Sequence, residues 1–504
     1  MNKILIIAAS VALLIVGYFV GQSGKPEPTV IKVAAEPKAA FVSAGAEDPA
    51  NALPGVVRSL ETFRSGVVVI VKDGESIQDA VAAAEPGTVI KVMPGTYKET
   101  VYIDKDNITL SGVIEQGNYP VLEGEGLRND AILYSGNGVT IENFFITHYK
   151  GNAVMGQAGN NFIIRNNIVV DTGVYGIFPQ LGKNGIVAHN VLSGIEDAAI
   201  YVGMSENIDV VFNEVFDSVA GIEIENSRYA LVESNYVHDN TGGILAFITP
   251  GLPIKTCGDV IIRNNFVVNN NTANFAIPGS LVSNIPEGTG ILVMACDDVV
   301  VEGNIITGNH SVGITFTDFA LAGNAAKDPD SDPYPNRPVI LNNLMYDNGK
   351  NPSAIVQAAL ATALLARAPD IVDTVGMDDG CISNPERFRT LGLDKYGECD
   401  ISTTANVTSY TLAEPVPPRS MEDLDKGRLA YYGVCAGCHA YSSRMIGPPT
   451  QILQALYMDN PEGIAEYAAN PVKKRDDYPE MPPQAHLDEE TRLAAAKFML
   501  SVDK

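Results

Sequence analysis

The chain has 504 residues and a hydrophobic content of 46%, which is enough for more than one domain and a sizeable core. Its formal net charge at pH 7 is −26, and this excess of carboxylates would repel the phosphates of nucleic acid. We therefore expect an acidic, soluble surface and no nucleic-acid partner.

The N-terminus carries a hydrophobic stretch, because residues 4–24 hold no charge and are mostly Ile, Leu, Val and Ala. This length just spans a membrane and is long for the apolar part of a signal peptide. No lipobox cysteine or clear cleavage site follows closely, so a helical anchor at 1–24 is favoured slightly over a cleaved signal. Both alternatives export the remaining chain to the periplasm. The segment 25–64 is rich in Ala, Pro and Glu without periodicity, and predicts a disordered tether.

The first element expected after the tether is a short amphipathic helix at residues 76–84. Ser76 is suited to cap its N-terminus, and Pro86-Gly87 would end it. Such a helix would cover the open strand edge at the start of a repeat.

Asparagine recurs between apolar pairs from residue 138 to residue 348. Successive gaps are 24, 23, 23, 22, 30, 39 and 39 residues, and 22 to 24 residues is about one coil of a three-sided parallel β-helix. The recurring positions are Asn143, Asn167, Asn190, Asn213, Asn235, Asn265, Asn304 and Asn343.

Two apolar columns follow the same period and predict strands that face the interior. Because side chains alternate across a strand, both columns should point into the coil and stack at about 4.8 Å. The columns are Ile177, Ile200, Ile222, Ile244, Ile291 and Ile314, and, two residues later, Pro179, Val202, Ile224, Ala246, Val293 and Phe316. This organisation resembles the right-handed parallel β-helix proteins of the pectate-lyase-like superfamily. A leucine-rich repeat has a similar period, but its leucine pattern is absent. We expect the β-helix to span residues 65–350.

Four cysteines are expected to form two disulfide bonds. Cys257 and Cys296 are 39 residues apart, the same offset as one step of the asparagine repeat, so they should lie on adjacent coils within bonding distance. The alternative is a pair of free core thiols. Cys381 and Cys399 lie in a loop-rich connector and are expected to pair with each other.

Outward positions on the isoleucine strands offer two carboxylates as candidate catalytic groups. Glu223 and Glu225 face the same way, so one carboxylate could raise the pKa of the other and create an acid/base pair. Tyr201 on the neighbouring coil is a third catalytic candidate. A solvated strand face is the favoured interpretation of these three residues.

Residues 174–180 resemble a degraded form of a motif found in alginate C5-epimerases. Phe178 and Gln180 stand where that family has its Asp and His, so the base for proton abstraction is missing. Exposed aromatic rings such as Phe178, Tyr201 and Phe247 would still suit a glycan-binding face.

A connector is expected at residues 351–419. It contains a helical pattern at 354–366, an irregular stretch at 370–400 and a stiff, proline-rich linker at 413–418.

The C-terminal segment contains Cys435-Ala436-Gly437-Cys438-His439, in which two thiols three residues apart are followed at once by histidine. Each thiol can add across a vinyl group of haem, and the adjacent imidazole then reaches the iron. A redox CxxC motif is the alternative, but it needs a βαβ context, and helical patterns surround these residues at 421–434 and 488–501. Residues 421–504 resemble a small monohaem class I cytochrome c.

The resemblance implies one covalent haem c in a small all-α domain at residues 420–504. It makes Cys435 and Cys438 the attachment sites, His439 the proximal iron ligand and Met481 the distal ligand. Three rivals for the distal position lie in the same segment: Met445, Met458 and His486.

These patterns together predict a mainly β protein with a C-terminal cytochrome c domain and an N-terminal hydrophobic helix. The favoured function is an exported electron carrier that meets a redox partner protein, is tethered to the membrane, and uses its β-helix to bind a partner protein or a glycan. The alternative is a polysaccharide-modifying β-helix enzyme with an attached redox domain.

Overall fold

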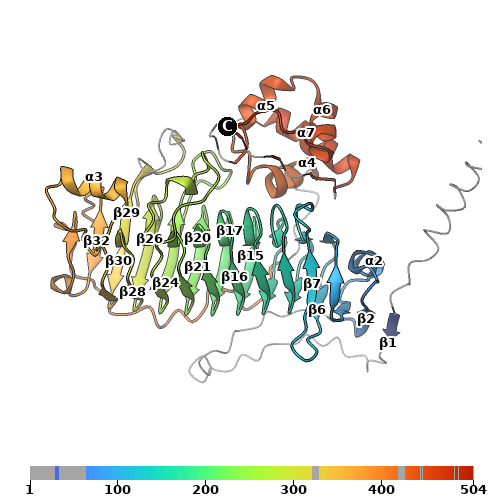
Figure 1. Ribbon diagram of the computed structural model, residues 1–504, viewed down its shortest axis with the longest axis horizontal. Helices are drawn as coiled ribbons and strands as arrows, with labels where there is room; N and C mark the ends of the chain where they lie inside the picture. The colour runs from blue at the N-terminus through green and yellow to red at the C-terminus, as the bar shows by residue number, and fades with distance from the viewer. Residues whose placement is uncertain are drawn as a thin grey trace, which may run out of the picture.

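The main body of the computed structural model is a parallel β-helix whose coils stack along the long axis of the molecule (Figure 1). The structure describes residues 29–32, 64–319, 328–417, 426–442, 444, 446–478, 480–481, 483–485 and 487–502. Each coil contributes one strand to each of three sheets, and the strands within a sheet are parallel apart from β1 (Thr29–Lys32).

The first sheet contains, in stacking order, β1, β2 (Val67–Val71), β3 (Val89–Val92), β6 (Thr109–Gly112), β9 (Thr140–Glu142), β12 (Phe162–Arg165), β15 (Lys183–Ala188), β18 (Glu206–Val211), β21 (Arg228–Glu233), β24 (Gly258–Arg263), β27 (Asp297–Glu302), β30 (Val339–Leu341) and β33 (Cys381–Ile382). The second contains β4 (Gly95–Tyr97), β7 (Pro120–Glu123), β10 (Phe145–Thr147), β13 (Ile168–Val170), β16 (Val191–Ser193), β19 (Glu214–Phe216), β22 (Tyr236–His238), β25 (Phe266–Val268), β28 (Ile305–Thr307) and β31 (Leu344–Tyr346). The third contains β5 (Val101–Ile103), β8 (Ile132–Tyr134), β11 (Val154–Gly156), β14 (Tyr175–Phe178), β17 (Ala198–Gly203), β20 (Ala220–Glu225), β23 (Gly242–Phe247), β26 (Thr289–Met294), β29 (Val312–Thr317), β32 (Ile371–Asp373) and β34 (Thr390–Leu391).

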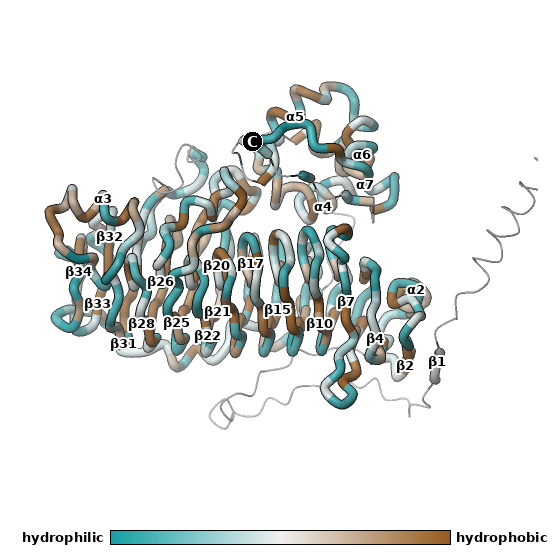
Figure 2. The backbone as a smooth tube through the Cα atoms, viewed as in Figure 1, coloured by the Kyte–Doolittle hydropathy of each residue, from teal (hydrophilic) through white to brown (hydrophobic). Residues whose placement is uncertain are grey.

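The isoleucine column forms the centre of the core, as predicted. Ile177 pairs with Ile200, and the register continues through every predicted isoleucine to Ile314 and then Ile371. All of these side chains are fully buried. Apolar segments recur in coil after coil along the solenoid (Figure 2).

The asparagine repeat forms a buried ladder that begins at Asn167. Each amide Nδ2 donates to the Oδ1 atom of the asparagine on the next coil, at 3.0 to 3.1 Å. The assignment of Asn143 to this ladder was wrong, because Phe144 occupies the equivalent position and donates its backbone N–H to Asn167. A second ladder, Asn240–Asn270–Asn309–Asn348, runs five residues later along the chain.

The start of the solenoid is covered on its open edge. Helix α2 (Ile77–Ala83) forms as expected, with the Ser76 side chain accepting the N–H of Asp79. The prediction of a disordered tether was wrong at residues 29–32, because β1 pairs antiparallel with β2. A strand added there satisfies backbone groups that the first coil leaves unpaired.

The solenoid continues past the expected boundary at residue 350. Helix α3 (Ala354–Thr362) is inserted between coils, and β32, β33 and β34 then add further rungs. The stretch 370–400 is therefore not wholly irregular. The inserted helix makes the step from Ile314 to Ile371 much longer than one coil, which is why the repeat is hidden in the sequence.

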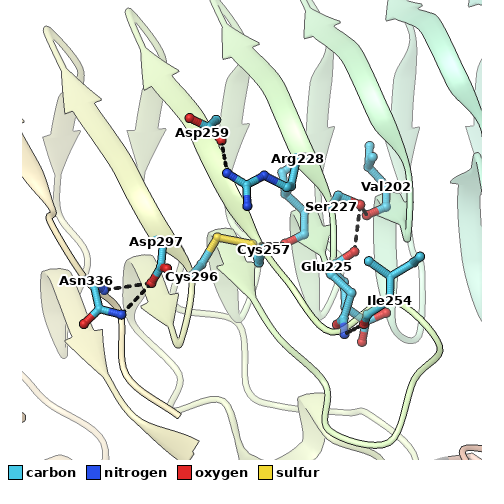
Figure 3. The surroundings of a disulfide bond; sticks show 12 residues. Val202, Glu225, Ser227, Arg228, Ile254, Cys257, Asp259, Cys296, Asp297 and Asn336 are labelled. Atoms are coloured by element: carbon cyan, nitrogen blue, oxygen red, sulfur yellow. Dashed lines mark hydrogen bonds and ion pairs between the residues drawn. A yellow bond between two sulfur atoms is a disulfide. The ribbon is translucent and has the colours of Figure 1, made fainter. Parts of the chain in front are cut away.

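Two disulfide bonds join the cysteine pairs named from the sequence. Cys257 and Cys296 lie on adjacent coils with a Cα–Cα distance of 4.7 Å (Figure 3). The Cα atoms of Cys381 and Cys399 are 5.0 Å apart, and this bond links strand β33 to the segment that follows the last rungs.

The segment 402–417 forms a strap along the outside of the first sheet and runs back toward the middle coils. Arg263 donates to the carbonyl oxygens of Thr404 and Val407, at 2.7 and 2.8 Å. Further along, Asn161 donates to the carbonyl oxygen of Val416 at 2.6 Å and accepts its N–H at 2.8 Å. The strap thereby returns the chain over many coils before the C-terminal helices begin.

The C-terminal helices form a compact unit above the middle coils (Figure 1). They are α4 (Lys426–Ala430), the π-helix η5 (Tyr431–Cys435), α5 (Thr450–Leu456), α6 (Pro461–Ala469) and α7 (Glu489–Ser501); short 3-10 turns η2 (Val282–Asn284) and η4 (Pro385–Arg387) lie in the solenoid. Among the described residues, no helix is long and apolar enough to cross a membrane. The expected hydrophobic helix at 1–24 lies outside the described residues.

Candidate functional site

The C-terminal helical unit encloses an apolar cavity of about 410 Å³. Helices α4 and α7 cross closely beside it, since a Cβ atom on Gly427 would lie 2.3 Å from the carbonyl oxygen of Ala494. The apolar part of the lining includes Val434, Ile446, Leu453, Leu456, Ile464, Leu487 and Met499. A cavity with such walls excludes water from a flat hydrophobic ligand.

Cys435 and Cys438 line this cavity, and both are free thiols. They lie where the π-helix η5 tightens into a turn, in which the N–H of Cys438 donates to the carbonyl oxygen of Cys435 at 3.1 Å. Burial raises the pKa of both thiols to about 12, so they remain protonated at neutral pH. A redox CxxC motif works through a thiolate with a lowered pKa, which makes that alternative a poor fit.

His439 is buried in the cavity wall with a defined tautomer. Its Nδ1–H donates to the carbonyl oxygen of Pro448 at 2.8 Å, which leaves Nε2 with a free lone pair. Burial lowers the pKa of the imidazole and favours this neutral form. A hydrogen bond from the second ring nitrogen is the usual device that orients a metal-binding histidine.

Gly447 lies against the His439 ring and has room for no side chain. A Cβ atom at Gly447 would lie 2.3 Å from Cε1 and 2.6 Å from Nδ1 of that ring. The Gly447-Pro448 pair therefore both supports the imidazole from one side and accepts its N–H.

Met481 also lines the cavity, whereas Met458 is 72% exposed. The other rivals for a distal iron ligand, Met445 and His486, lie outside the described residues. Met499 is a cavity-lining methionine that the sequence reasoning missed, and it packs among the helices with Tyr431 and Ala436. Its spacing within α7 gave it the pattern of an ordinary core residue.

The cavity contains one orphaned donor that tests its fit to haem. Nε of Arg492 is buried and no described residue accepts its N–H, while Nη1 of the same guanidinium donates to the carbonyl oxygen of Leu487. Haem carries two propionates, and a carboxylate would accept the remaining N–H. With two thiols, a neutral imidazole, a thioether and an apolar wall, the residues present fit a covalent haem.

The helical unit lies against the outer face of the third sheet. Gly437 faces the Gln180 side chain and the Phe178 ring, and Ala440 packs in an apolar cluster with Met204 and Leu252. Residues 435–439 therefore lie between the cavity on one side and the β-helix on the other.

This docking overturns the expectation of a solvated face at Glu223, Glu225 and Tyr201. Glu223 is 1% exposed and Glu225 is 2% exposed, because the loop around Ser280 and the side chain of Ile446 cover them. Burial raises the pKa of Glu225 to about 8, and it raises the pKa of Glu223 well above its usual value.

The aromatic rings expected to form a glycan-binding face are buried as well. Phe178, Tyr201 and Phe247 are each at most 3% exposed. The ring of Tyr201 contacts those of Phe178 and Tyr175, with centroids 4.4 and 4.5 Å away. On this face the rings form part of the interface with the helical unit and its neighbouring loop.

Comparison with family models supports the architecture. Residues 95–284 match the model described as "Periplasmic copper-binding protein (NosD)", and residues 218–363 match "Right handed beta helix region". The chain is a right-handed parallel β-helix protein. No curated protein matches it.

Solved structures with a similar fold include the A-module of a mannuronan C-5 epimerase from Azotobacter vinelandii, at 13% identity, 60% coverage of this chain, 87% of that chain and a TM-score of 0.40. An alginate lyase from Paenibacillus is 14% identical, with coverages of 56% and 97% and a TM-score of 0.42. A periplasmic alginate epimerase is 13% identical, with coverages of 56% and 82% and a TM-score of 0.29. These values carry no inference about chemistry.

Proposed function

We propose that this protein is an exported electron carrier with one haem c attached through Cys435 and Cys438. His439 is the proximal iron ligand in this proposal, and Met481 is the distal ligand. When bound, the haem supplies a one-electron iron couple, and histidine with methionine favours a comparatively high potential. The chain's own residues orient the imidazole, exclude water and balance charge.

The observation that carries the proposal is the state of His439 beside two free thiols. The hydrogen bond to Pro448 presents Nε2 as a neutral ligand, and the Cys435 and Cys438 side chains line the same cavity.

In this proposal the β-helix is a rigid scaffold that holds the carrier and docks a partner protein or a glycan. The periplasmic description of the matching family model is consistent with export. We propose that residues 1–24 hold the protein to the inner membrane from the periplasmic side.

The test is expression in a host that matures c-type cytochromes, followed by mass spectrometry and absorption spectroscopy. We expect the mass of one haem on the intact chain, a Soret band, and loss of both in a Cys435→Ser, Cys438→Ser variant. Met481→Ala should keep the covalent haem and lose the sulfur-to-iron charge-transfer band. A colourless wild-type protein from a host that matures a control cytochrome would refute the proposal.

The alternative of a polysaccharide-modifying enzyme places its acid/base pair at Glu223 and Glu225. Both carboxyls are buried beneath the Ser280 loop and Ile446, so a polymer cannot reach them in this arrangement. A polysaccharide-cleaving activity that disappears in a Glu223→Gln, Glu225→Gln variant would restore this alternative.

A further inference from the structure

Three carboxyl groups line one small buried pocket between the β-helix and the helical unit. Asp197 precedes β17, and Glu223 and Glu225 lie on β20; all three line a cavity of about 20 Å³. Oε1 of Glu223, Oε2 of Glu225 and Oγ of Ser280 are buried there without a hydrogen-bond partner among the described residues. This volume is close to that of a single water molecule.

Burial favours the protonated form of all three carboxyls. It raises the pKa of Asp197 to about 7, that of Glu225 to about 8 and that of Glu223 well above its usual value, and the charge of Asp197 adds to the effect on Glu223 and Glu225. Three carboxylates side by side in so small and buried a pocket would be very costly without cations, so the pocket holds at least one proton at neutral pH.

Ile446 is the wall between this pocket and the proposed haem cavity. Its side chain lines both, and it also lines an open groove of about 680 Å³ that holds Glu196, His148, Lys150 and Glu480. The Ile446 side chain therefore separates the carboxyl pocket from the proposed haem cavity. It also separates both from the open groove, whose titratable groups are exposed to solvent.

We infer that the Asp197–Glu223–Glu225 pocket releases a proton when the haem beyond Ile446 is oxidised, and takes one up when it is reduced. This inference rests on the proposed function. A one-electron acceptor in solution removes the electron, and the proton leaves one carboxyl for water in the groove. The protein thus moves a proton together with each electron rather than an electron alone.

The direction follows from charge. Loss of an electron leaves one more positive charge behind Ile446, and a positive charge favours the ionised form of a nearby acid. The acids therefore have lower pKa values in the oxidised protein, and the midpoint potential falls as pH rises through the interval between the two values. The slope cannot exceed 59 mV per pH unit, the limit of one proton per electron.

Other titratable and charged groups face the pocket and its surroundings. The Tyr175 hydroxyl interacts with all three carboxyls, and Tyr201 lies within the pocket wall. Cys438 lies within the electrostatic reach of Asp197 and Asp130, but a thioether does not titrate. Burial raises the pKa of Tyr175 well above its usual value, so this residue does not titrate near neutrality and leaves the inference unchanged.

The experiment is a spectroelectrochemical titration of the mature haem protein from about pH 6 to about pH 10. We expect a sloped region that includes the neighbourhood of pH 8, where Glu225 titrates, with a flatter line on either side. An Asp197→Asn, Glu223→Gln, Glu225→Gln variant, which removes all three carboxyls, should flatten this region. Glu115→Gln, an exposed carboxyl on a solvent loop, is the matched control and should keep the wild-type curve.

An infrared difference spectrum of oxidised minus reduced protein supplies a second readout. The wild-type protein should lose the carbonyl band of a protonated carboxylic acid on oxidation, and the triple variant should not. A flat potential in wild-type protein that carries haem would overturn this inference and leave the proposed function standing. A slope that survives in the triple variant, with haem content intact, would also overturn it. Absence of haem from the wild-type protein would refute both.

Discussion

The asparagine ladder should carry a measurable share of the stability of the solenoid. In Asn213→Ala, five hydrogen bonds disappear: Nδ2 donates to Asn235 and to the carbonyl oxygens of Val187 and Val211, and Oδ1 accepts from the backbone and side-chain N–H groups of Asn190. At least two buried donors of Asn190 lose their acceptor. Each unsatisfied buried donor costs about 1–3 kcal/mol, so we expect a loss of about 4 kcal/mol.

The assay is urea unfolding followed by far-ultraviolet circular dichroism, since the chain has no tryptophan. Asn351→Ala removes an exposed amide and should change the free energy of unfolding by no more than about 0.5 kcal/mol. Asn343→Ala removes only three bonds at the ladder's end, but it deprives the same two donors of Asn304 of this acceptor, so it should cost about as much as Asn213→Ala. A loss for Asn213→Ala no larger than that of the exposed control would refute the reasoning.

Three further predictions follow from single contacts. Gly447→Ala should lower the haem-to-protein ratio, because the added Cβ atom overlaps the His439 ring; an unchanged ratio and spectrum would contradict this role. The Cys257→Ser, Cys296→Ser variant should lower the free energy of unfolding by about 4 kcal/mol, the chain entropy of closing a loop of about 39 residues. An unchanged thermal midpoint would contradict this prediction and would assign the stability of these coils to the asparagine ladders. Burial raises the pKa of Asp130 to about 6, so ionisation of this carboxyl lowers the free energy of unfolding by up to about 3 kcal/mol as pH rises from about 4 through 6. Asp130→Asn should lessen the drop in thermal midpoint between these pH values. An equal drop in both proteins would contradict the assignment.

Local periodicity accounts for the part of the fold that the sequence predicts well. The isoleucine column and most of the asparagine ladder repeat at one-coil spacing, and stacking of parallel strands converts that spacing directly into contacts. The second ladder has the same spacing, because its asparagines follow those of the first by five residues from Asn235 onward. It could therefore have been predicted from the sequence in the same way. Asn143 was misassigned because a one-residue shift puts Phe144 at the ladder position.

The burial of Glu223 and Glu225 could not be predicted from the local sequence, because the segments that cover them are distant along the chain. Their neighbours on the strand are ordinary outward positions, and nothing local marks them as covered. The cover comes from Ser280, in a loop inserted two coils later, and from Ile446, which arrives only after the strap 402–417 has returned the chain. A periodic pattern specifies which face a side chain occupies but not what later packs on that face.

The proposed haem-attachment motif, Cys435 to His439, faces two surfaces, and only one of them can be predicted from its sequence. Cys435, Cys438 and His439 face the cavity, where their thiols and imidazole would hold the haem. Gly437 is explained by the opposite side, where a Cβ atom would lie 3.3 Å from Nε2 of Gln180, a buried amide with no hydrogen-bond partner among the described residues. A large side chain at this position would separate the helical unit from the third sheet and open the carboxyl pocket to water. Gly437 of the motif is thus constrained by the β-helix, which ties the proposed haem site to the carboxyl-lined face beneath it.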